Sequence, residues 1–158
     1  MNVRLLAVAA AALLALPACS QKNIPGTSIP DTDDTRSLVA LMDAYRNSVE
    51  TGDVEKLSKL VASTFRDNGG TAAPDDDLDR SNLEPALRER FSRLANVRLD
   101  MDIRSIDVQR REDTAHAIFY YTLRFEMPGL SDRLQTSADL KRMDFRREDG
   151  EWRIQSGL

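Results

Sequence analysis

The sequence predicts one domain of the α+β class, with helices in its first half and an antiparallel sheet in its second. Two observations support this class. Between residues 35 and 94 the apolar residues recur at steps of three and four, which is the spacing of one helix face. From residue 97 onward apolar and polar residues alternate, which is the pattern of strands with one buried face.

The first helix is expected over residues 35–51. Gly52 follows it, and glycine readily adopts the left-handed conformation that ends a helix. Asp53 comes next and predicts the start of a second helix, because its carboxylate can accept a hydrogen bond from an early backbone N–H. The apolar stripe of the first helix consists of Leu38, Leu41, Met42, Tyr45 and Val49.

The second helix is expected to run from Val54 to near Ser63, with a short strand at residues 64–66 after it. A loop rich in glycine, proline and aspartate then leads to a third helix that begins at Ser81. Glu84 stands three residues further on, which predicts a capping box. The buried stripe of this helix consists of Leu83, Leu87, Phe91 and Leu94.

Four strands complete the domain. Asp149 and Gly150 form a hairpin signal before the last strand. In the strand before that hairpin the apolar register changes between Leu140 and Met143, which predicts a β-bulge. The strands are expected at residues 97–103, 114–127, 134–148 and from 152 onward.

The order of these elements resembles the nuclear transport factor 2-like superfamily, which includes ketosteroid isomerases, polyketide cyclases and scytalone dehydratase. The segments "YRNSVETGDVEKLSKLVASTF" and "FRREDGEWRIQSGL" carry the resemblance, which covers residues 35–158. It implies a cone-shaped fold in which three N-terminal helices pack in a strongly curved antiparallel sheet. The residues expected to line the pocket at the open end of the cone are Tyr45, Phe65, Phe91, Phe119 and Tyr121.

The resemblance also implies a candidate catalytic pair, Tyr45 and Asp67. In ketosteroid isomerases a tyrosine at the spacing of Tyr45 from Gly52 donates a hydrogen bond to the oxyanion, and an aspartate after the short strand is the general base. Asp67 comes earlier than that pattern requires, and no second acid can be assigned. Tyr45 also fits the apolar stripe of its helix, and Asp67 also suits a turn.

Two hypotheses follow, because this superfamily contains both enzymes and non-catalytic domains. The leading one is a non-catalytic domain that binds a small apolar ligand or an envelope protein, with a second copy of the chain as a further candidate partner. The alternative is a cofactor-free isomerase or lyase that uses Tyr45 and Asp67. No cofactor is expected in either case.

The first residues predict export and lipid attachment. Residues 1–18 combine Arg4, a short apolar run and a small-residue end, which is typical of a signal peptide. The segment "LPAC" resembles a bacterial lipobox and places the single cysteine, Cys19, where a lipid would be attached. Residues 19–34 are expected to form a flexible tether. Ser20 in place of aspartate favours the outer membrane, with the domain facing the periplasm.

Several functional classes are disfavoured. A net charge of -4 argues against nucleic acid as a partner. The single histidine, His116, and the single cysteine give no zinc site, and residues 75–86 fail the spacing of a calcium loop. The basic residues of the later strands are interpreted as one solvated face of the sheet. They are Arg110, Arg111, Lys141, Arg142, Arg146 and Arg147.

Overall fold

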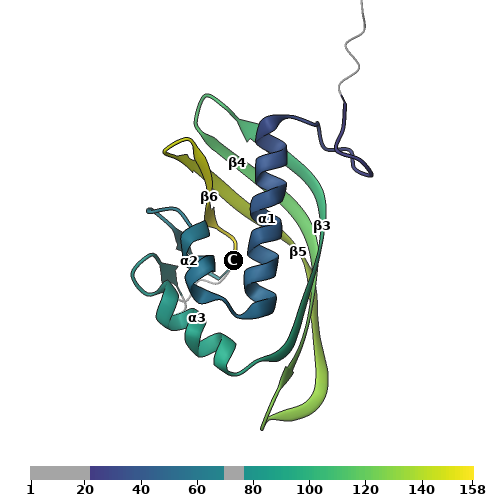
Figure 1. The fold of residues 1–158 in the computed structure, drawn as a ribbon, viewed down its shortest axis with the longest axis vertical. Coiled ribbons are helices and arrows are strands. Elements are labelled where there is room, and N and C mark those ends of the chain that lie inside the picture. The colour runs from purple at the N-terminus through teal and green to yellow at the C-terminus, as the bar shows by residue number, and fades with distance from the viewer. Residues whose placement is uncertain (1–21, 70–76) are drawn as a thin grey trace, which may run out of the picture.

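The computed structural model describes residues 22–69 and 77–158. In these residues a four-stranded antiparallel sheet, in the order β3-β4-β5-β6, packs against three helices, and β1 pairs with β2 in a separate small sheet (Figure 1). The predicted α+β class is confirmed. The helices are α1 (Asp33–Thr51), α2 (Val54–Leu60) and α3 (Leu83–Ser92). The strands are β1 (Arg66–Asp67), β2 (Leu78–Asp79), β3 (Ala95–Gln109), β4 (Thr114–Met127), β5 (Ser131–Glu148) and β6 (Glu151–Ser156).

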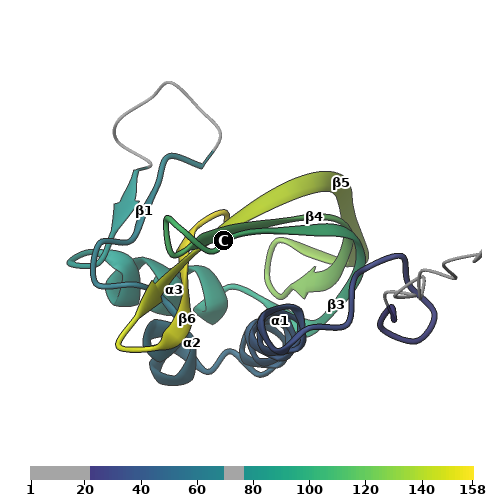
Figure 2. The same cartoon turned by 90° about the horizontal axis from the view of Figure 1, so that it is seen from above.

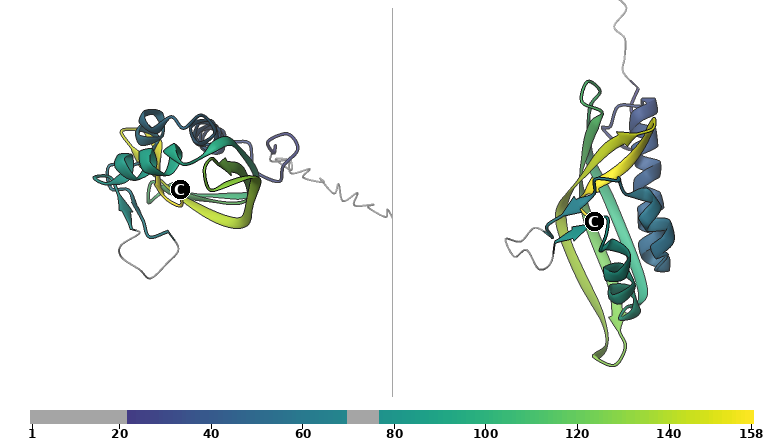
Figure 3. Two further views of the ribbon diagram at one scale, coloured as in Figure 1. Left: turned by 90° about the horizontal axis from the view of Figure 1, so that it is seen from below. Right: turned by 90° about the vertical axis from the view of Figure 1, so that its left-hand side faces the viewer.

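The large sheet is bent, and the helices lie on its concave side (Figure 2). The hairpin between β4 and β5 continues past the helices at one end of the molecule (Figure 3). Pairing in register puts Met101 opposite Tyr121 on the concave side, whereas Asp102 and Tyr120 pair on the outer side. The alternation in the sequence therefore separates a face that packs on the helices from a face that meets solvent.

Helix α1 begins two residues earlier than predicted, because Thr32 caps it. The Thr32 hydroxyl accepts a hydrogen bond from the Thr35 N–H, and the Thr35 hydroxyl accepts one from the Thr32 N–H in return. At the other end Gly52 takes the left-handed conformation at φ 64°, as predicted. Asp53 caps α2 by accepting from the Lys56 N–H at 2.9 Å, also as predicted.

Residues 22–32 differ from the flexible tether that was predicted for residues 19–34. Asn23 and Pro30 form an antiparallel bridge, so the segment folds back on itself. Ile29 is 2% exposed and belongs to the core, and Ile24 packs against the core. The apolar isoleucines explain the difference, because a compact loop that buries them gains more than a solvated linker would. The tether prediction overlooked these two side chains.

The connection between α2 and α3 corrects three further predictions. Helix α2 ends at Leu60 and not near Ser63, because Val61 is extended and bridges to Ile154 of β6. The predicted strand at residues 64–66 is displaced to β1, and its partner β2 was not predicted. The capping box of Ser81 is absent: the Ser81 hydroxyl bonds the Asp79 carboxylate, and α3 begins at Leu83 without a side-chain cap.

The predicted bulge between Leu140 and Met143 is also wrong. The pairing of β4 with β5 is continuous through this region, and the shift in β5 lies between Asp144 and Phe145, on the side of β6. Leu140 interrupts the pattern because it lies on the outer face, where it is 47% exposed and opposite Tyr120. The apolar residue was therefore a surface residue and not a sign of irregular pairing.

Polar contacts fix α1 to the sheet at both of its ends. Near the N-terminal end, the Asp34 carboxylate pairs with Arg147 and, at 3.0 Å, with Arg110. Near the C-terminal end, a Glu50 carboxylate oxygen accepts a hydrogen bond from the Leu99 N–H of β3 at 2.9 Å. These contacts hold the helix at a defined position over the concave face, and so define the space that remains beside it.

Candidate functional site

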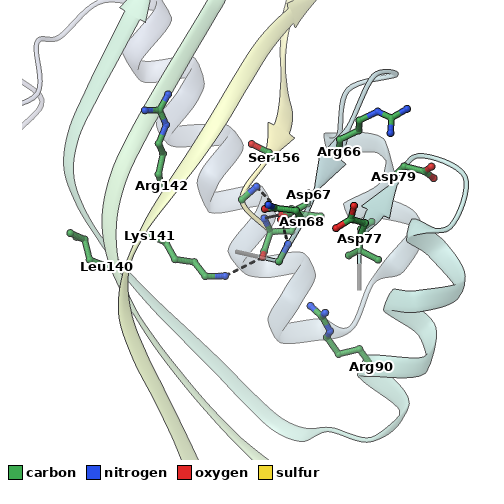
Figure 4. Close-up of a pocket in the computed structure, with 14 residues that line it drawn as sticks. Arg66, Asp67, Asn68, Asp77, Asp79, Arg90, Leu140, Lys141, Arg142 and Ser156 are labelled. Carbon is green, nitrogen blue, oxygen red and sulfur yellow. Dashed lines mark hydrogen bonds between the residues drawn. The ribbon is translucent and has the colours of Figure 1, made fainter. Parts of the chain in front are cut away.

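Two cavities adjoin each other. The inner one lies between the helices and the concave face of the sheet. The outer one lies between the β1–β2 pair, the last residues of the chain and β5. The inner cavity has a volume of about 140 Å³, and the outer one has a volume of about 770 Å³. Arg90, Lys141 and Leu158 line both cavities, so these residues mark their junction. Figure 4 shows the outer cavity, with Arg90 and Lys141 extending toward it from opposite sides.

The inner cavity is mainly apolar. Helix α1 contributes Tyr45 and Val49, and α3 contributes Leu87 and Phe91, all at helical spacings that turn them toward the sheet. The inward positions of the strands supply the opposite wall through Val97, Leu99, Phe119, Tyr121 and Leu123. The cavity exists because these side chains, although they point toward one another, do not fill the space that the curved sheet leaves.

Tyr45 points into the inner cavity and keeps its proton at neutral pH. Burial raises the pKa of Tyr45 to about 12, while the nearby Arg90 acts in the opposite direction and the negative charge of Asp67 adds to the rise. The residue as a whole is only partly buried, because the cavity opens beside it. Among the described residues no hydrogen-bond partner is found for its hydroxyl, which is therefore an available donor.

Asp67 holds three main-chain amides. One of its oxygens accepts from the Gly69 N–H at 2.9 Å, and the other accepts from the N–H groups of Gly157 and Leu158 at 2.8 and 2.7 Å. These contacts tie the loop after β1 to the last residues of the chain (Figure 4). Asp67 lines the outer cavity and not the inner one, so it does not share a cavity with Tyr45. The catalytic roles suggested for this pair stay predictions.

The aromatic residues predicted to line a pocket separate into two groups. Tyr45, Phe91, Phe119 and Tyr121 line the inner cavity together. Phe65 lies elsewhere: it is 1% exposed within the core and lines neither the inner nor the outer cavity. Phe65 follows a turn in which its N–H bonds the Ala62 carbonyl, and this turn directs it into the core.

Arg90 and Lys141 were missed as site residues. Lys141 was assigned to a solvated sheet face, but it lies on the concave side, in the same alternating series as the buried Met143 and Phe145. Arg147 continues this series and contacts α1 through Asp34, so the basic residues do not form one face. The alternation itself contained the signal, since a lysine in step with buried residues must point inward.

Comparisons with known proteins identify the fold. No protein-family model matches the sequence, and no curated protein matches it. A proposed dehydratase of the NTF2-like family from Streptomyces avermitilis is similar in structure, with a TM-score of 0.65 and 18% identity over 78% of this chain and 93% of that one. A proposed scytalone dehydratase from Novosphingobium aromaticivorans is similar with a TM-score of 0.63 and 14% identity, over 78% and 80% of the two chains. This chain has the nuclear transport factor 2-like fold.

Neighbours with the nuclear transport factor 2-like fold carry names of different functional classes. A proposed calcium/calmodulin-dependent protein kinase II association domain from Xanthomonas campestris matches with a TM-score of 0.64 and 17% identity, over 87% of this chain and 90% of that one. The two dehydratases have the names of enzymes, whereas the Xanthomonas campestris protein is named as an association domain. The fold therefore fixes the position of the cavities but not their use.

Across residues 22–69 and 77–158 there is no cluster of three or more histidine, cysteine, aspartate or glutamate residues suited to a metal ion. Within the same ranges no helix is long and apolar enough to span a membrane. The expected signal peptide and the expected lipidation site, Cys19, lie outside the described residues.

Proposed function

We propose that this chain is a lipid-anchored protein of the bacterial cell envelope that binds a small apolar ligand and does not catalyse a reaction. The observation that supports ligand binding best is the inner cavity, with about 140 Å³ of space between apolar and aromatic side chains. Protein interiors are normally close-packed, and an unfilled cavity costs stability. A ligand that occupies this space restores the missing contacts.

The volume limits the size of the apolar group. An apolar cavity of about 150 Å³ stays dry and accepts one benzene ring. The inner cavity is of this size, so it suits one ring or a hydrocarbon chain of similar volume. A larger ligand would have to pass the junction at Arg90, Lys141 and Leu158 and continue into the outer cavity.

The positions and hydrogen bonds of the carboxylates support a non-catalytic role. A general base must lie within hydrogen-bond reach of the proton that it removes. Asp67 does not line the inner cavity, and the three main-chain N–H groups that it binds hold it in place beside the outer one. Asp144 is bonded to Arg142 at 2.8 Å and to Ser156, and Asp139 accepts from the Leu140 N–H. The isomerase or lyase alternative is therefore the weaker one.

An NMR titration of the full chain with toluene tests the ligand-binding proposal. We expect saturable shifts of amide signals around the inner cavity in the wild type. Val97→Phe should abolish them, because Val97 lines the cavity and the larger ring occupies it. Val108→Phe is the matched control on the same strand, since Val108 is partly buried but does not line the cavity. Equal binding by both variants, or no saturable binding by the wild type, would contradict the proposal.

The envelope location rests on the first residues of the sequence. Cys19 is three residue steps before Lys22, where the described structure begins. Three extended residues span at most about 11 Å, so a lipid on Cys19 would hold the folded domain close to the membrane surface. In fractionated cells, Cys19→Ala should move the protein from the membrane to the soluble fraction, whereas Ser20→Ala should not. Membrane association that survives Cys19→Ala would rule out acylation as the anchor.

A further inference from the structure

The junction of the two cavities brings together two cationic side chains. Arg90 reaches it from the last turn of α3, and Lys141 reaches it from the concave face of β5 (Figure 4). Both residues line the apolar inner cavity as well as the polar outer one. A ligand that fills the inner cavity and extends outward must therefore pass between an arginine and a lysine.

The Arg90 guanidinium is not paired with any of the described residues. Within residues 22–69 and 77–158 its side chain forms no ion pair and no hydrogen bond. The neighbouring basic residues differ from it in this respect: Arg142 is paired with Asp144 at 2.6 Å, and Arg93, directly after the same helix, is paired with Glu89. An arginine presents a planar set of donors that matches a carboxylate in two parallel hydrogen bonds.

Lys141 and Tyr45 add further donors at the same place. The Lys141 ammonium donates to the Leu158 main-chain oxygen at 3.1 Å and lies 5.3 Å from the centre of the Tyr121 ring. An ammonium has three donors, so this single hydrogen bond leaves others for a ligand. The Tyr45 hydroxyl is protonated, has no partner among the described residues, and is close enough to Arg90 to sense its charge.

The acidic residues nearby restrict the charge of the ligand. Asp67 lies beside the junction, but its oxygens are already held by three main-chain N–H groups, and it forms no ion pair with Arg90. Asp77 and Asp79 lie on the wall of the outer cavity. A compact dianion such as a phosphate would be repelled by these three carboxylates, whereas a single carboxylate at the junction would meet a smaller penalty.

We propose that the ligand is a small monocarboxylate whose apolar part occupies the inner cavity and whose carboxylate binds Arg90 and Lys141, with the Tyr45 hydroxyl as a third donor. This inference rests on the ligand-binding function proposed above and names its chemical class. The carboxylate accepts from Lys141 through a donor that the Leu158 oxygen does not use. The ligand is thus held by apolar contacts on one side and by charge on the other.

Calorimetric titration of the full chain with phenylacetate and with its neutral analogue phenylacetamide tests this inference. The two probes share the same ring, and only the first carries a charge. We expect phenylacetate to bind about tenfold more tightly, because hydrogen bonds between charged partners are the stronger ones. Arg90→Gln and Lys141→Gln should each remove most of this preference, so that the affinities for the two probes become nearly equal. Arg93→Gln, directly after the same helix, should leave the preference as it is in the wild type.

The possible failures can be told apart. If both probes bind with the same affinity, and Arg90→Gln and Lys141→Gln change neither, the carboxylate assignment is wrong and the apolar ligand site remains. If neither probe nor toluene binds the wild type, the ligand-binding function itself is wrong. Urea unfolding of each variant serves as the folding control. If a variant has the same unfolding midpoint as the wild type and still prefers phenylacetate over phenylacetamide to the same degree, the inference is wrong.

Discussion

Asp67 shows how one side chain can organise the mouth of the site. Its carboxylate joins the loop after β1 to Gly157 and Leu158 through three main-chain hydrogen bonds. Leu158 in turn lines both cavities and accepts a hydrogen bond from Lys141. Asp67 and Gly157 therefore determine the position of Leu158. They determine through it the opening between the two cavities.

Gly157 is required at its position by both its dihedral angle and its surroundings. It has φ 91°, and a Cβ atom there would lie 2.3 Å from the Arg142 carbonyl oxygen. We expect Gly157→Ala to lower the free energy of unfolding by about 2 kcal/mol, because the last residues must leave Asp67. Urea unfolding measures this loss, and NMR shifts of the Gly69 amide report the release.

Gly150→Ala is the matched control for this prediction. Gly150 also has a positive φ, 82°, but no atom lies within 4 Å of its Cβ position. It should cost only about 1 kcal/mol, the penalty for a left-handed alanine. Equal losses in the two variants would show that the contact with Arg142 is not what makes Gly157 necessary.

Individual site residues could be predicted from the sequence only in part. Tyr45 and Phe91 were recognisable because helical spacing shows which side chains face the sheet. Phe65 follows a turn, and no periodic pattern there indicates which way its side chain points. Arg90 and Lys141 were missed because charged residues are usually solvated, and only the packed structure shows that the two converge on one opening.

At the level of elements, α1 is held to the sheet by a partly buried charge network. The Asp34 side chain is 15% exposed and binds Arg147, Arg110 and the Trp152 indole N–H. The Arg147 guanidinium also stacks on the Trp152 ring, 4.4 Å from its centre. Burial opposes ionisation of Asp34, but the hydrogen bonds from Arg147 and Arg110 outweigh it and lower the pKa of this carboxyl.

Because of Asp34, the stability of the protein should therefore change with pH in the acidic range. A lowered pKa contributes stability above the unfolded value, near 4, and this contribution is lost as the pH falls through the folded pKa. We expect Asp34→Asn to lower the free energy of unfolding by about 2 kcal/mol at neutral pH, because Arg147 loses its charged partner. At pH values below the lowered pKa of Asp34 the two proteins should converge.

Urea unfolding at several pH values measures this convergence. Asp43→Asn is the control. Asp43 is an exposed residue of the same helix, and among the described residues its only ion pair is with Arg46, at 3.2 Å. It should change stability by less than about 0.5 kcal/mol at any pH. A constant difference between the wild type and Asp34→Asn across the pH range would contradict the account of Asp34.

The segment before α1 gives a second prediction about elements. Ile29 is 2% exposed, so Ile29→Ala should remove core packing and lower the free energy of unfolding by about 2–4 kcal/mol. Leu134→Ala, at a side chain that is 57% exposed, should have little effect. If residues 22–32 behaved as a free tether, Ile29→Ala would be as neutral as Leu134→Ala.

The helices and strands were predictable where residues that are close in the sequence determine the structure. Helix α1 and the long strands repeat their periods over many residues, and Gly52 and Asp53 act within their own turn. The errors lie where distant residues decide. Val61 leaves α2 to pair with Ile154, and residues 22–32 fold because the core accepts Ile29. Neither contact can be inferred from neighbouring sequence.

At the level of the whole molecule, the first described residues and the cavities lie toward different ends. Residues 22–32 lie beyond the N-terminal end of α1, whereas α2 and α3 lie toward its C-terminal end (Figure 1). Tyr45, which lines the inner cavity, belongs to the C-terminal half of α1. A lipid on Cys19 would place the N-terminal end of α1 nearest the membrane. The outer cavity would then remain open to small molecules in the surrounding compartment.

A crystal of the full chain pressurised with xenon would show directly whether the inner cavity exists, since an apolar cavity of about 150 Å³ binds this gas. We expect one ordered xenon atom between Tyr45, Phe91 and Phe119, absent in Val97→Phe and retained in Val108→Phe. A wild-type crystal without xenon at this position, with neighbouring side chains filling the space, would contradict the existence of the ligand cavity.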